Sequence, residues 1–267
     1  PVPVAPAMHG YMLGNPAVEK NLGVLASWGV NIIGPHTDEN RARVASVSEV
    51  VSWAIKLLSH DDLRKKRILV IGGRSEEPLD SMRLITNRSS GLMAVTLAQR
   101  AFERGADVEL WMGGGSVDVP DFIPVKRYET VGDLIGMLGS IDHDLVIVPA
   151  ALADFTPEKK VEGKIPSGEG FTMSLKPVPK VLPLIRGKCQ NVIGYKAESG
   201  LSRSDLVKKA RGRLEEYDLM ACVANDVDSA GKTSASMILV TRDEATDITG
   251  SKAAISDMIL NFVAQRL

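Results

Sequence analysis

The sequence predicts an α/β protein in which a doubly wound, mostly parallel sheet lies between two layers of helices. From residue 67 onward, apolar runs typical of buried strands alternate with amphipathic stretches typical of helices. The run at 144–148 lacks the alternation of a half-exposed strand, which favours parallel pairing with both faces covered. The segment 155–183 interrupts this pattern, because it is rich in Lys, Glu, Gly and Pro. A stretch of that length without a helix predicts a flap with a small β-extension.

The elements follow in chain order. Residues 1–60 form the first predicted unit, with helices at 16–28 and 48–59 around a short strand at 30–35, and the charged residues 61–66 form a linker. Residues 67–267 form the main unit. Its strands are expected at 68–73, 107–112, 144–148, 191–195, 219–224 and 236–240, and its helices at 89–104, 130–138, 202–216 and 252–265. One further strand is expected inside the flap, at 171–175, and a loop at 225–235.

Composition excludes several classes of function. The 267 residues carry a net charge of −1, with 24% of them charged, which gives no electrostatic reason to expect nucleic-acid or anionic-membrane binding. No apolar run approaches the roughly 20 residues that span a bilayer, and no signal segment opens the chain, so we expect a cytoplasmic protein. Cys189 and Cys222 lie far apart without metal-ligand spacing, and we expect them to be small, at least half-buried apolar residues.

The most informative stretch is 68–93. Its strand ends in Gly72 and Gly73, and a helix begins near Ser90 and Gly91. Free N–H groups at such a helix start bind phosphate, although any helix can also begin with a plain serine cap. The intervening loop is far longer than the Gly-x-Gly-x-x-Gly turn of a dinucleotide site. Asn87 lies just ahead of the helix, so we expect a nucleotide site that also holds a second substrate.

Other strand ends are also polar or rich in small residues, at 149–154, 194–198 and 224–226. In an open α/β sheet, ligands bind at the carboxyl ends of the strands. Ala150 and Ala151 would let a flat ring or a sugar approach the backbone, and Asp154 would face the crevice. Asp154 could instead be an ordinary cap or turn carboxylate.

Three cations are candidates for phosphate contacts. Lys164 lies in the flap, where it could neutralise charge that develops in phosphoryl or nucleotidyl transfer, although most flap lysines are simply solvated. Lys209 and Arg213 are four residues apart and share one face of a helix, which is ordinarily a solvated face. By themselves, these residues predict a nucleotide-binding α/β enzyme and do not identify its substrate.

A set of motifs taken together resembles the family of phosphopantothenate–cysteine ligase (phosphopantothenoylcysteine synthetase). The motifs are GGRSEEPLD (72–80), ITNRSSG (85–91), AALADF (150–155), EGKI (162–165), PKVL (179–182), GYKAE (194–198) and ANDV (224–227), in the family's order. Residues 1–60 resemble the end of the phosphopantothenoylcysteine decarboxylase domain that is often fused ahead of this ligase, through PAMHGYMLGNPAVEKNL (6–22) and GVNIIGP (29–35). His9 replaces an asparagine of that domain, and residues 36–45 have no counterpart of its catalytic-cysteine segment. We therefore expect neither FMN binding nor decarboxylation by this chain.

The resemblance implies that 4′-phosphopantothenate is joined to L-cysteine. In this family the carboxylate attacks the α-phosphate of CTP (or ATP), pyrophosphate leaves, and the cysteine amine displaces the nucleotide from the acyl-nucleotidylate. Mg²⁺ neutralises the triphosphate. The resemblance also implies a Rossmann-like fold, a homodimer whose flap reaches the neighbour's site, and association with a phosphopantothenoylcysteine decarboxylase domain.

The same resemblance assigns roles to individual residues. Asn87 and Lys164 are expected to be catalytic, and Asn87, Arg88, Ser89 and Asn225 to bind the acyl substrate. The amide of Asn87 would donate to an acyl oxygen. The expected nucleotide-binding residues are Gly72, Gly73, Ser90, Gly91, Pro149, Ala150, Ala151, Asp154, Lys164, Pro179, Lys180, Val181, Leu182, Tyr195, Lys209 and Arg213, with Tyr195 stacking on the base. No metal ligand is assigned, and Lys196, in place of an alanine of bacterial members, leaves the choice between CTP and ATP open.

Two other interpretations stay open at this point. An NAD(P)-dependent Rossmann oxidoreductase would fit the strand, loop and helix at 68–102, but the Gly-x-Gly-x-x-Gly motif is absent. A non-catalytic remnant that helps a fused partner to oligomerise would fit residues 1–60.

Overall fold

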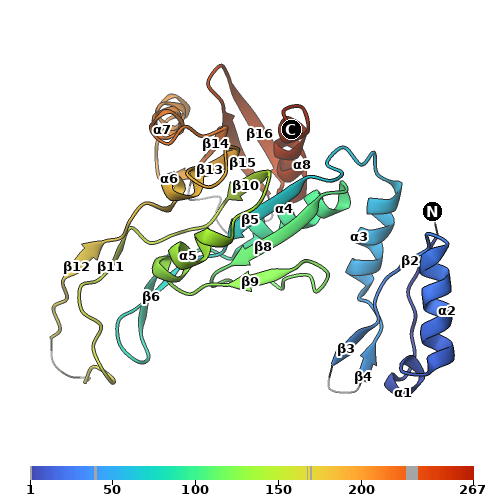
Figure 1. The fold of residues 1–267 in the computed structure, drawn as a ribbon. Coiled ribbons are helices and arrows are strands. Elements are labelled where there is room, and N and C mark those ends of the chain that lie inside the picture. The colour runs from blue at the N-terminus through green and yellow to red at the C-terminus, as the bar shows by residue number, and fades with distance from the viewer. Residues whose placement is uncertain (1, 39–40, 167, 169, 227–233) are drawn as a thin grey trace.

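The centre of the molecule is a mostly parallel sheet. The computed structural model describes residues 2–38, 41–166, 168, 170–226 and 234–267 (Figure 1). Within them, eight strands pair in the order β16-β15-β14-β13-β10-β5-β8-β9. The bounds are β5 Arg67–Gly72, β8 Asp107–Met112, β9 Val125–Arg127, β10 Leu145–Val148, β13 Val192–Glu198, β14 Ala221–Asp226, β15 Ser234–Val240 and β16 Ala245–Ser251. Pairing is parallel from β9 to β14, and β15 and β16 are added antiparallel.

The order of the strands defines where a ligand can bind. The first strand of the sheet in chain order is β5. Strands β8 and β9 are added on one side of it, and β10, β13 and β14 follow on the other side. This is the strand order of dinucleotide-binding folds, in which the crevice opens where the direction of growth reverses. Here the reversal lies between β5 and β10, at their carboxyl ends.

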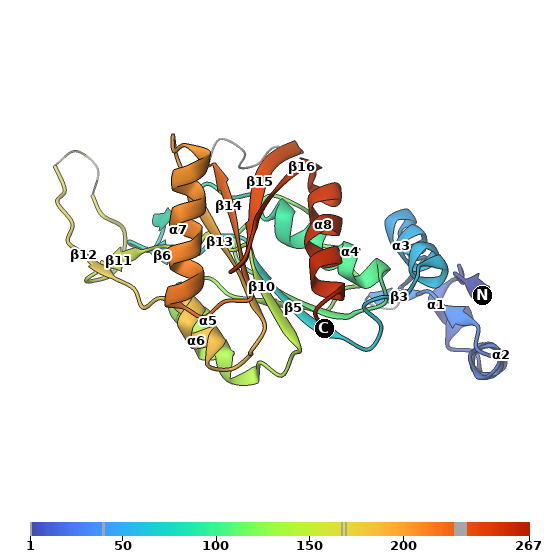
Figure 2. The same ribbon diagram turned by 90° about the horizontal axis from the view of Figure 1, so that it is seen from above.

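Helices cover both faces of the sheet (Figure 2). On one face, α4 (Leu92–Glu103) and α8 (Lys252–Ala264) pack over Ile68 and Val70; on the other, α5 (Val131–Met137), α6 (Val181–Arg186) and α7 (Arg203–Glu216) pack over Leu69 and Ile71. A short 3₁₀ helix (Leu138–Ser140) follows α5. Successive strand residues alternate between the two cores, as the pleat requires. The predicted three-layer, doubly wound fold is confirmed.

Two β-arms extend beside the carboxyl edge of the sheet. One is a hairpin of β6 (Glu76–Pro78) and β7 (Leu84–Thr86), and the other is the flap ribbon of β11 (Phe155–Pro157) and β12 (Leu175–Pro177). The buried carboxylate of Asp80 ties them together, because it accepts hydrogen bonds from the backbone N–H of Ile165 (3.0 Å) and of Met82 (2.8 Å). These bonds, that of Ile165 foremost, hold the pKa of Asp80 at about 2, below its ordinary 3.8. The hairpin therefore anchors the root of the flap.

The N-terminal residues contact the main unit mainly through one helix, and also through an ion pair between Arg43 and Asp121 (2.6 Å). Their elements are β1 (Pro3–Val4), α1 (Gly10–Leu13), α2 (Pro16–Ser27), β2 (Asn31–Ile32), β3 (His36–Asp38), β4 (Arg41–Arg43) and α3 (Val47–Leu58). Neither α1 nor α2 has a buried residue. By contrast, α3 contacts α4: the Ser52 hydroxyl donates to Glu103 (2.8 Å), and the Trp53 ring meets Phe102 edge-on. The helices expected at 16–28 and 48–59 are present.

Some elements differ from those that the sequence predicts. The loop expected between 74 and 88 contains the β6–β7 hairpin, and the flap strand expected at 171–175 begins only at Leu175. Helix α6 was not expected, because it is six residues long and contains Pro183; proline is tolerated there because it lies in the first turn. The edge strands β9 and β16 were missed as well, because both present polar residues to solvent. No helix in the described residues is long and apolar enough to cross a membrane.

Candidate active site

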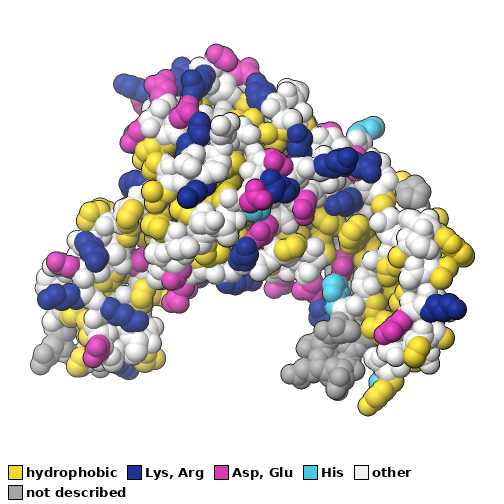
Figure 3. Space-filling model, in the orientation of Figure 1, with side chains coloured by type: hydrophobic (Ala, Val, Ile, Leu, Met, Phe, Trp, Pro, Cys, Tyr) yellow, Lys and Arg dark blue, Asp and Glu magenta, His cyan; other side chains and the backbone are white. Residues whose placement is uncertain are grey.

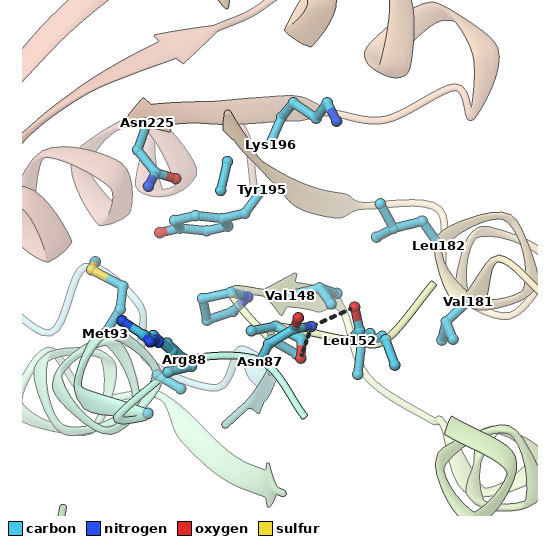
Figure 4. Close-up of a pocket in the computed structure, with 18 of the residues that line it drawn as sticks. Asn87, Arg88, Met93, Val148, Leu152, Val181, Leu182, Tyr195, Lys196 and Asn225 are labelled. Carbon is cyan, nitrogen blue, oxygen red and sulfur yellow. Dashed lines mark hydrogen bonds between the residues drawn. The ribbon is translucent and has the colours of Figure 1, made fainter. Parts of the chain in front are cut away.

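A cavity of about 940 Å³ opens at the carboxyl edge of the sheet, at the β5–β10 reversal (Figure 4). Segments far apart in the sequence converge on it: the approach to α4, the loop after β10, the start of α6, and the ends of β13 and β14. The predicted site residues that line it are Asn87, Arg88, Ser89, Ser90, Gly91, Pro149, Ala150, Ala151, Asp154, Pro179, Lys180, Val181, Leu182, Tyr195, Arg213 and Asn225. Gly72, Gly73, Lys164 and Lys209 are not among its lining residues.

The loop after β10 forms one wall and is held by backbone hydrogen bonds to the end of β5. The N–H of Ala151 donates to the carbonyl of Gly73 (2.8 Å), and the N–H of Ser75 donates back to the carbonyl of Ala151 (3.3 Å). The fully buried hydroxyl of Ser75 accepts from the N–H of Ala153 (2.9 Å). The sequence offered no signal for Ser75, because its role depends on a partner 78 positions away.

Asn87 bridges the two halves of the cavity. Its side-chain amide donates to the carbonyls of Ala151 (3.1 Å) and Leu152 (3.0 Å), as the dashed lines in Figure 4 show. Both partners are acceptors, so the NH₂ group must face them and the amide oxygen must point away. Both amide hydrogens are therefore engaged within the chain. The expected donation to an acyl oxygen would require the amide to exchange one of these partners for the ligand.

The start of α4 offers backbone donors to the cavity. Gly91 is the N-cap with φ of 82°, and no side chain caps the helix through it. The Ser90 hydroxyl accepts from the N–H of Leu92 (3.3 Å), while Arg74 holds the preceding turn by donating to the carbonyl of Ser89 (2.9 Å). The first turn of a helix presents N–H groups and a positive dipole end, which suits an anion.

Gly72 and Gly73 allow backbone segments to approach one another behind the cavity. A Cβ on Gly72 would lie 1.9 Å from the Cβ of Ala94 in α4. Gly73 has φ of 80°, and a Cβ there would lie 2.7 Å from the carbonyl oxygen of Gly114. Close packing of β5 against α4 and the end of β8 thus accounts for both glycines, and their predicted contact with phosphate stays a prediction.

The opposite end of the cavity is built around Tyr195 and α6. Figure 4 shows the Tyr195 ring on one side of the cavity and Asn87 with Val148 on the other, with Val181 and Leu182 beyond them. The Tyr195 hydroxyl is buried and has no hydrogen-bond partner among the described residues, and burial raises its pKa. Arg213 donates to the Tyr195 carbonyl (3.3 Å). Asp154 and Lys180 form a solvent-exposed ion pair at the mouth, which a ligand can displace at little cost.

Lys209 contacts the cavity wall indirectly. It pairs with Glu198 (3.0 Å), and the same carboxylate pairs with Lys196 (2.6 Å), which lines the cavity. Hydrogen bonds from Lys196 and then Lys209 lower the pKa of Glu198. Lys209 and Lys196 thus share one carboxylate, Lys209 is not among the residues that line the cavity, and its predicted nucleotide contact stays a prediction.

Lys164 lies in the flap, is exposed, and stays outside the cavity of its own chain. Its neighbours fix the flap root: the N–H of Ser81 donates to the carbonyl of Gly163 (3.0 Å). Several lining residues were not expected, namely Met93, Ser116, Tyr217, Met237 and Lys252. Met93, Met237 and Lys252 belong to α4, β15 and α8, Ser116 lies in the loop after β8, and Tyr217 ends α7. No local signal marks them as part of a site.

No group of three or more His, Cys, Asp or Glu side chains arranged to hold a metal ion occurs in the described part of the chain. Asp154 is the one carboxylate among the described residues that line the cavity. A divalent cation in this site would thus depend mainly on oxygens of a bound ligand and of water, which is the usual way for Mg²⁺ to bind with phosphates.

The chain is similar to known proteins over nearly its whole length. Residues 63–267 match the family model described as DNA/pantothenate metabolism flavoprotein C-terminal domain, and residues 1–59 match the flavoprotein model. It is 36% identical over 252 residues to the coenzyme A biosynthesis bifunctional protein CoaBC of Thermococcus kodakarensis, covering 92% of this chain and 62% of that protein. It is 33% identical over 272 residues to CoaBC of Methanocaldococcus jannaschii, covering 98% of this chain and 66% of that protein. The chain thus spans less than two thirds of these relatives' length.

Solved structures agree on the fold. The DNA/pantothenate metabolism flavoprotein from Streptococcus pneumoniae superposes with a TM-score of 0.68 at 22% identity, covering 76% of this chain and all (100%) of that one. The C-terminal domain of a CoaBC protein superposes with a TM-score of 0.63 at 24% identity, covering 77% of this chain and 97% of that one. Since the family model matches residues 63–267, the chain belongs to the family of the DNA/pantothenate metabolism flavoprotein C-terminal domain.

Proposed function

We propose that this protein is a phosphopantothenate–cysteine ligase of cytoplasmic coenzyme A biosynthesis, which joins 4′-phosphopantothenate to L-cysteine with CTP or ATP. The observation that carries the proposal is the convergence of the motifs: residues from 87–91, 149–154, 179–182 and 195 line one cavity at the β5–β10 reversal. The names of the relatives support it, since they are bifunctional proteins of coenzyme A biosynthesis.

The cavity suits a reaction that depends on positioning and charge. Its described lining includes the cations Lys180, Lys196 and Arg213, which can balance a triphosphate and the charge that forms at the α-phosphate. Tyr195, Val181 and Leu182 offer an apolar site for a base and sugar, and Asp154 can accept from a nucleoside amine or hydroxyl. Mg²⁺, held by the nucleotide phosphates, would supply further neutralisation of the triphosphate when bound.

Asn87 lies between the end of the cavity proposed to hold the nucleotide and the start of α4. The acyl-nucleotidylate would form beside Asn87. The carboxylate of 4′-phosphopantothenate attacks the α-phosphorus, the bond to pyrophosphate breaks, and the amine of cysteine then displaces the nucleotide from the acyl carbon. In this scheme Asn87 holds the loop 151–152 against the acyl group, and Arg88 and Ser89 bind the rest of the acyl substrate with Asn225.

Lys164 enters the scheme through a homodimer. The two arms carry exposed apolar side chains at Met82, Leu84, Phe155, Phe171 and Leu175, and Figure 3 shows hydrophobic side chains on this part of the surface. Such side chains on extended arms favour burial against a second copy. The flap of one subunit would then bring Lys164 to the site of the other.

A mixing experiment tests this arrangement. Asn87→Asp and Lys164→Met should each retain little activity alone, whereas mixed subunits should recover about a quarter of wild-type activity, because half of randomly formed dimers are mixed and each has one intact site. Mixtures as inactive as the separate variants, in samples shown to exchange subunits, would exclude a shared site.

The ligase activity itself is tested by pyrophosphate release. Release should require both phosphopantothenate and CTP or ATP, and product formation should also require cysteine. Competition between the two nucleotides identifies the preferred one. No release with either nucleotide would refute the proposal and would favour a non-catalytic role for the chain.

Residues 1–60 enter the proposal as the C-terminal part of a decarboxylase-like domain, joined by 61–66 to the ligase domain at 67–267. The match of residues 1–59 to the flavoprotein model and the bifunctional names of the relatives support this division. It predicts association with a phosphopantothenoylcysteine decarboxylase domain, which co-purification with that domain would show.

The strand order favours one alternative, an NAD(P)-dependent oxidoreductase, because it is the order of dinucleotide-binding folds. The hairpin β6–β7 occupies the place of the short glycine turn that would cradle a dinucleotide. A fluorescence titration with NADH distinguishes the ligase from the oxidoreductase, since tight NADH binding would favour the oxidoreductase.

A further inference from the structure

Lys252 is a buried cation without a role in the scheme above. It is the first residue of α8, its exposed fraction is 7%, and it lines the cavity. No hydrogen bond or ion pair joins its ammonium group to any residue that the structure describes. Burial alone lowers its pKa. The side chain is enclosed by protein, and its ammonium group faces the open cavity rather than a carboxylate of the described residues. A cation in that position suits a ligand that supplies the negative charge.

The start of α8 faces the same edge of the sheet as the start of α4. Ser251, at the end of β16, pairs with Ser234 at the beginning of β15, and β15 follows the carboxyl end of β14. Both helices cover the same face of the sheet, where Arg100 of α4 pairs with Asp257 of α8 (2.9 Å). Helices α4 and α8 have 12 and 13 residues, so both direct the positive ends of substantial dipoles at this side of the cavity.

The groups that share the cavity with Lys252 suit a phosphate group. Ser90, Met93 of the first turn of α4 and Ser116 line the same cavity, so hydroxyl groups and a first-turn N–H group face it together with this cation. The one lining carboxylate in the described chain, Asp154, is paired with Lys180 at the start of α6. Met93 and Asn225 lie away from Val181 and Leu182 in Figure 4, so the cavity continues past Asn87 toward this side.

We infer that Lys252 and the first turn of α4 bind the phosphate monoester of the acyl substrate, and that Lys252 thereby selects phosphorylated pantothenate over pantothenate. The inference rests on the proposed function. It assumes that the nucleotide occupies the end of the cavity beside α6 and that the acyl-nucleotidylate forms at Asn87. The remaining end, beyond Asn87, then receives the far end of the acyl substrate.

The test compares Lys252→Met with wild type and with Lys208→Met, a matched control at an exposed position of α7 outside the cavity. Methionine keeps the length and the apolar part of the side chain and removes the charge. Loss of one charge-assisted hydrogen bond predicts that the KM for phosphopantothenate rises about 10- to 100-fold. The KM for the nucleotide should stay unchanged, and Lys252→Arg should restore much of the loss.

Preference for the phosphorylated substrate gives a second readout. The ratio of kcat/KM for phosphopantothenate to that for pantothenate should fall by the same factor in Lys252→Met and stay at the wild-type value in Lys208→Met. An unchanged KM for phosphopantothenate, or a rise of equal size in the KM for the nucleotide, would overturn the inference while leaving the ligase assignment intact.

A wild-type protein without turnover would instead refute the proposed function. The anion site is then judged by amine labelling of the whole chain followed by mass spectrometry. Inorganic phosphate should reduce the labelling of Lys252 and leave the labelling of Lys208 unchanged. Equal labelling of Lys252 with and without phosphate would refute the proposed anion site.

Discussion

Replacing Gly73 with alanine tests why the sequence places two glycines at the end of β5. Gly73 has φ of 80°, which costs an alanine about 1–2 kcal/mol. The new Cβ would lie 2.7 Å from the oxygen of Gly114 and 2.9 Å from the carbonyl carbon of Gly113, both backbone atoms held by the end of β8. Overpacking of this kind costs about 1–3 kcal/mol. Gly73→Ala should therefore lower the free energy of unfolding by about 2–5 kcal/mol.

The same substitution at Gly212 is the matched control. Gly212 lies inside α7, and a Cβ there would have no neighbour within 4 Å. Alanine in a helix interior is better than glycine by roughly 0.5–1 kcal/mol, so Gly212→Ala should stabilise the protein. The two variants carry the same substitution at different positions, and their changes in the free energy of unfolding should have opposite signs.

Urea denaturation followed by circular dichroism measures both effects, and a nucleotide-binding titration accompanies it. If Gly73 served only as a phosphate cradle, Gly73→Ala would bind nucleotide weakly and keep its stability. A Gly73→Ala protein within roughly 0.5 kcal/mol of wild type would refute the packing account given for β5.

Three further predictions concern the cavity and the flap. Asn87→Asp places a carboxylate against the carbonyls of Ala151 and Leu152, so kcat should fall about 10- to 100-fold while the free energy of unfolding falls by no more than about 1–3 kcal/mol; wild-type kcat would contradict this. Tyr195→Phe removes a buried hydroxyl that has no partner among the described residues, and should raise the free energy of unfolding by about 1 kcal/mol, whereas a loss of stability would reveal a partner. Asp80 has a pKa of about 2, so its contribution to stability is complete above its ordinary pKa of 3.8 and disappears as pH falls through about 2. Asp80→Asn should accordingly flatten the acid side of a curve of stability against pH, and an unaltered slope would show that its hydrogen bonds do not stabilise the fold.

The core of the fold could be predicted because its strands have a clear local sequence pattern. The runs in β5 and β10 are apolar on both faces, which only a strand covered on both sides can tolerate. Strand β16 could not be found in this way, since its residues are mostly polar and it is a strand because β15 pairs with it. The β6–β7 hairpin could not be found either, because each of its strands has only three residues. It is held both by its own turn, where Asp80 accepts from the N–H groups of Met82 and Arg83, and by the bond from Ile165 of the flap.

The site could be predicted where chemistry and strand ends coincide. Asp154 lies in the loop after β10, Tyr195 lies in β13, and Asn87 lies just ahead of α4, and all three line the same cavity. Ser75 and Lys252 could not be found, because the role of each depends on tertiary neighbours. Ser75 accepts from a backbone N–H in the loop after β10, and Lys252 shares the cavity with the start of another helix, α4. In the proposed homodimer Lys164 would meet a ligand in the other subunit's site, and the pattern of one chain does not specify such a contact.

The bonds that hold the cavity wall also determine when the cavity can exist. Ser75 belongs to the first βα unit of the sheet, whereas Ala153, whose N–H it accepts, follows the fourth strand in chain order. This wall cannot form until β10 has paired with β5, after β8 and β9 have been added on the other side of the sheet. Ligand affinity should therefore appear late in folding, as a single step, and a fragment ending before β10 should bind nothing even if its strands and helices form.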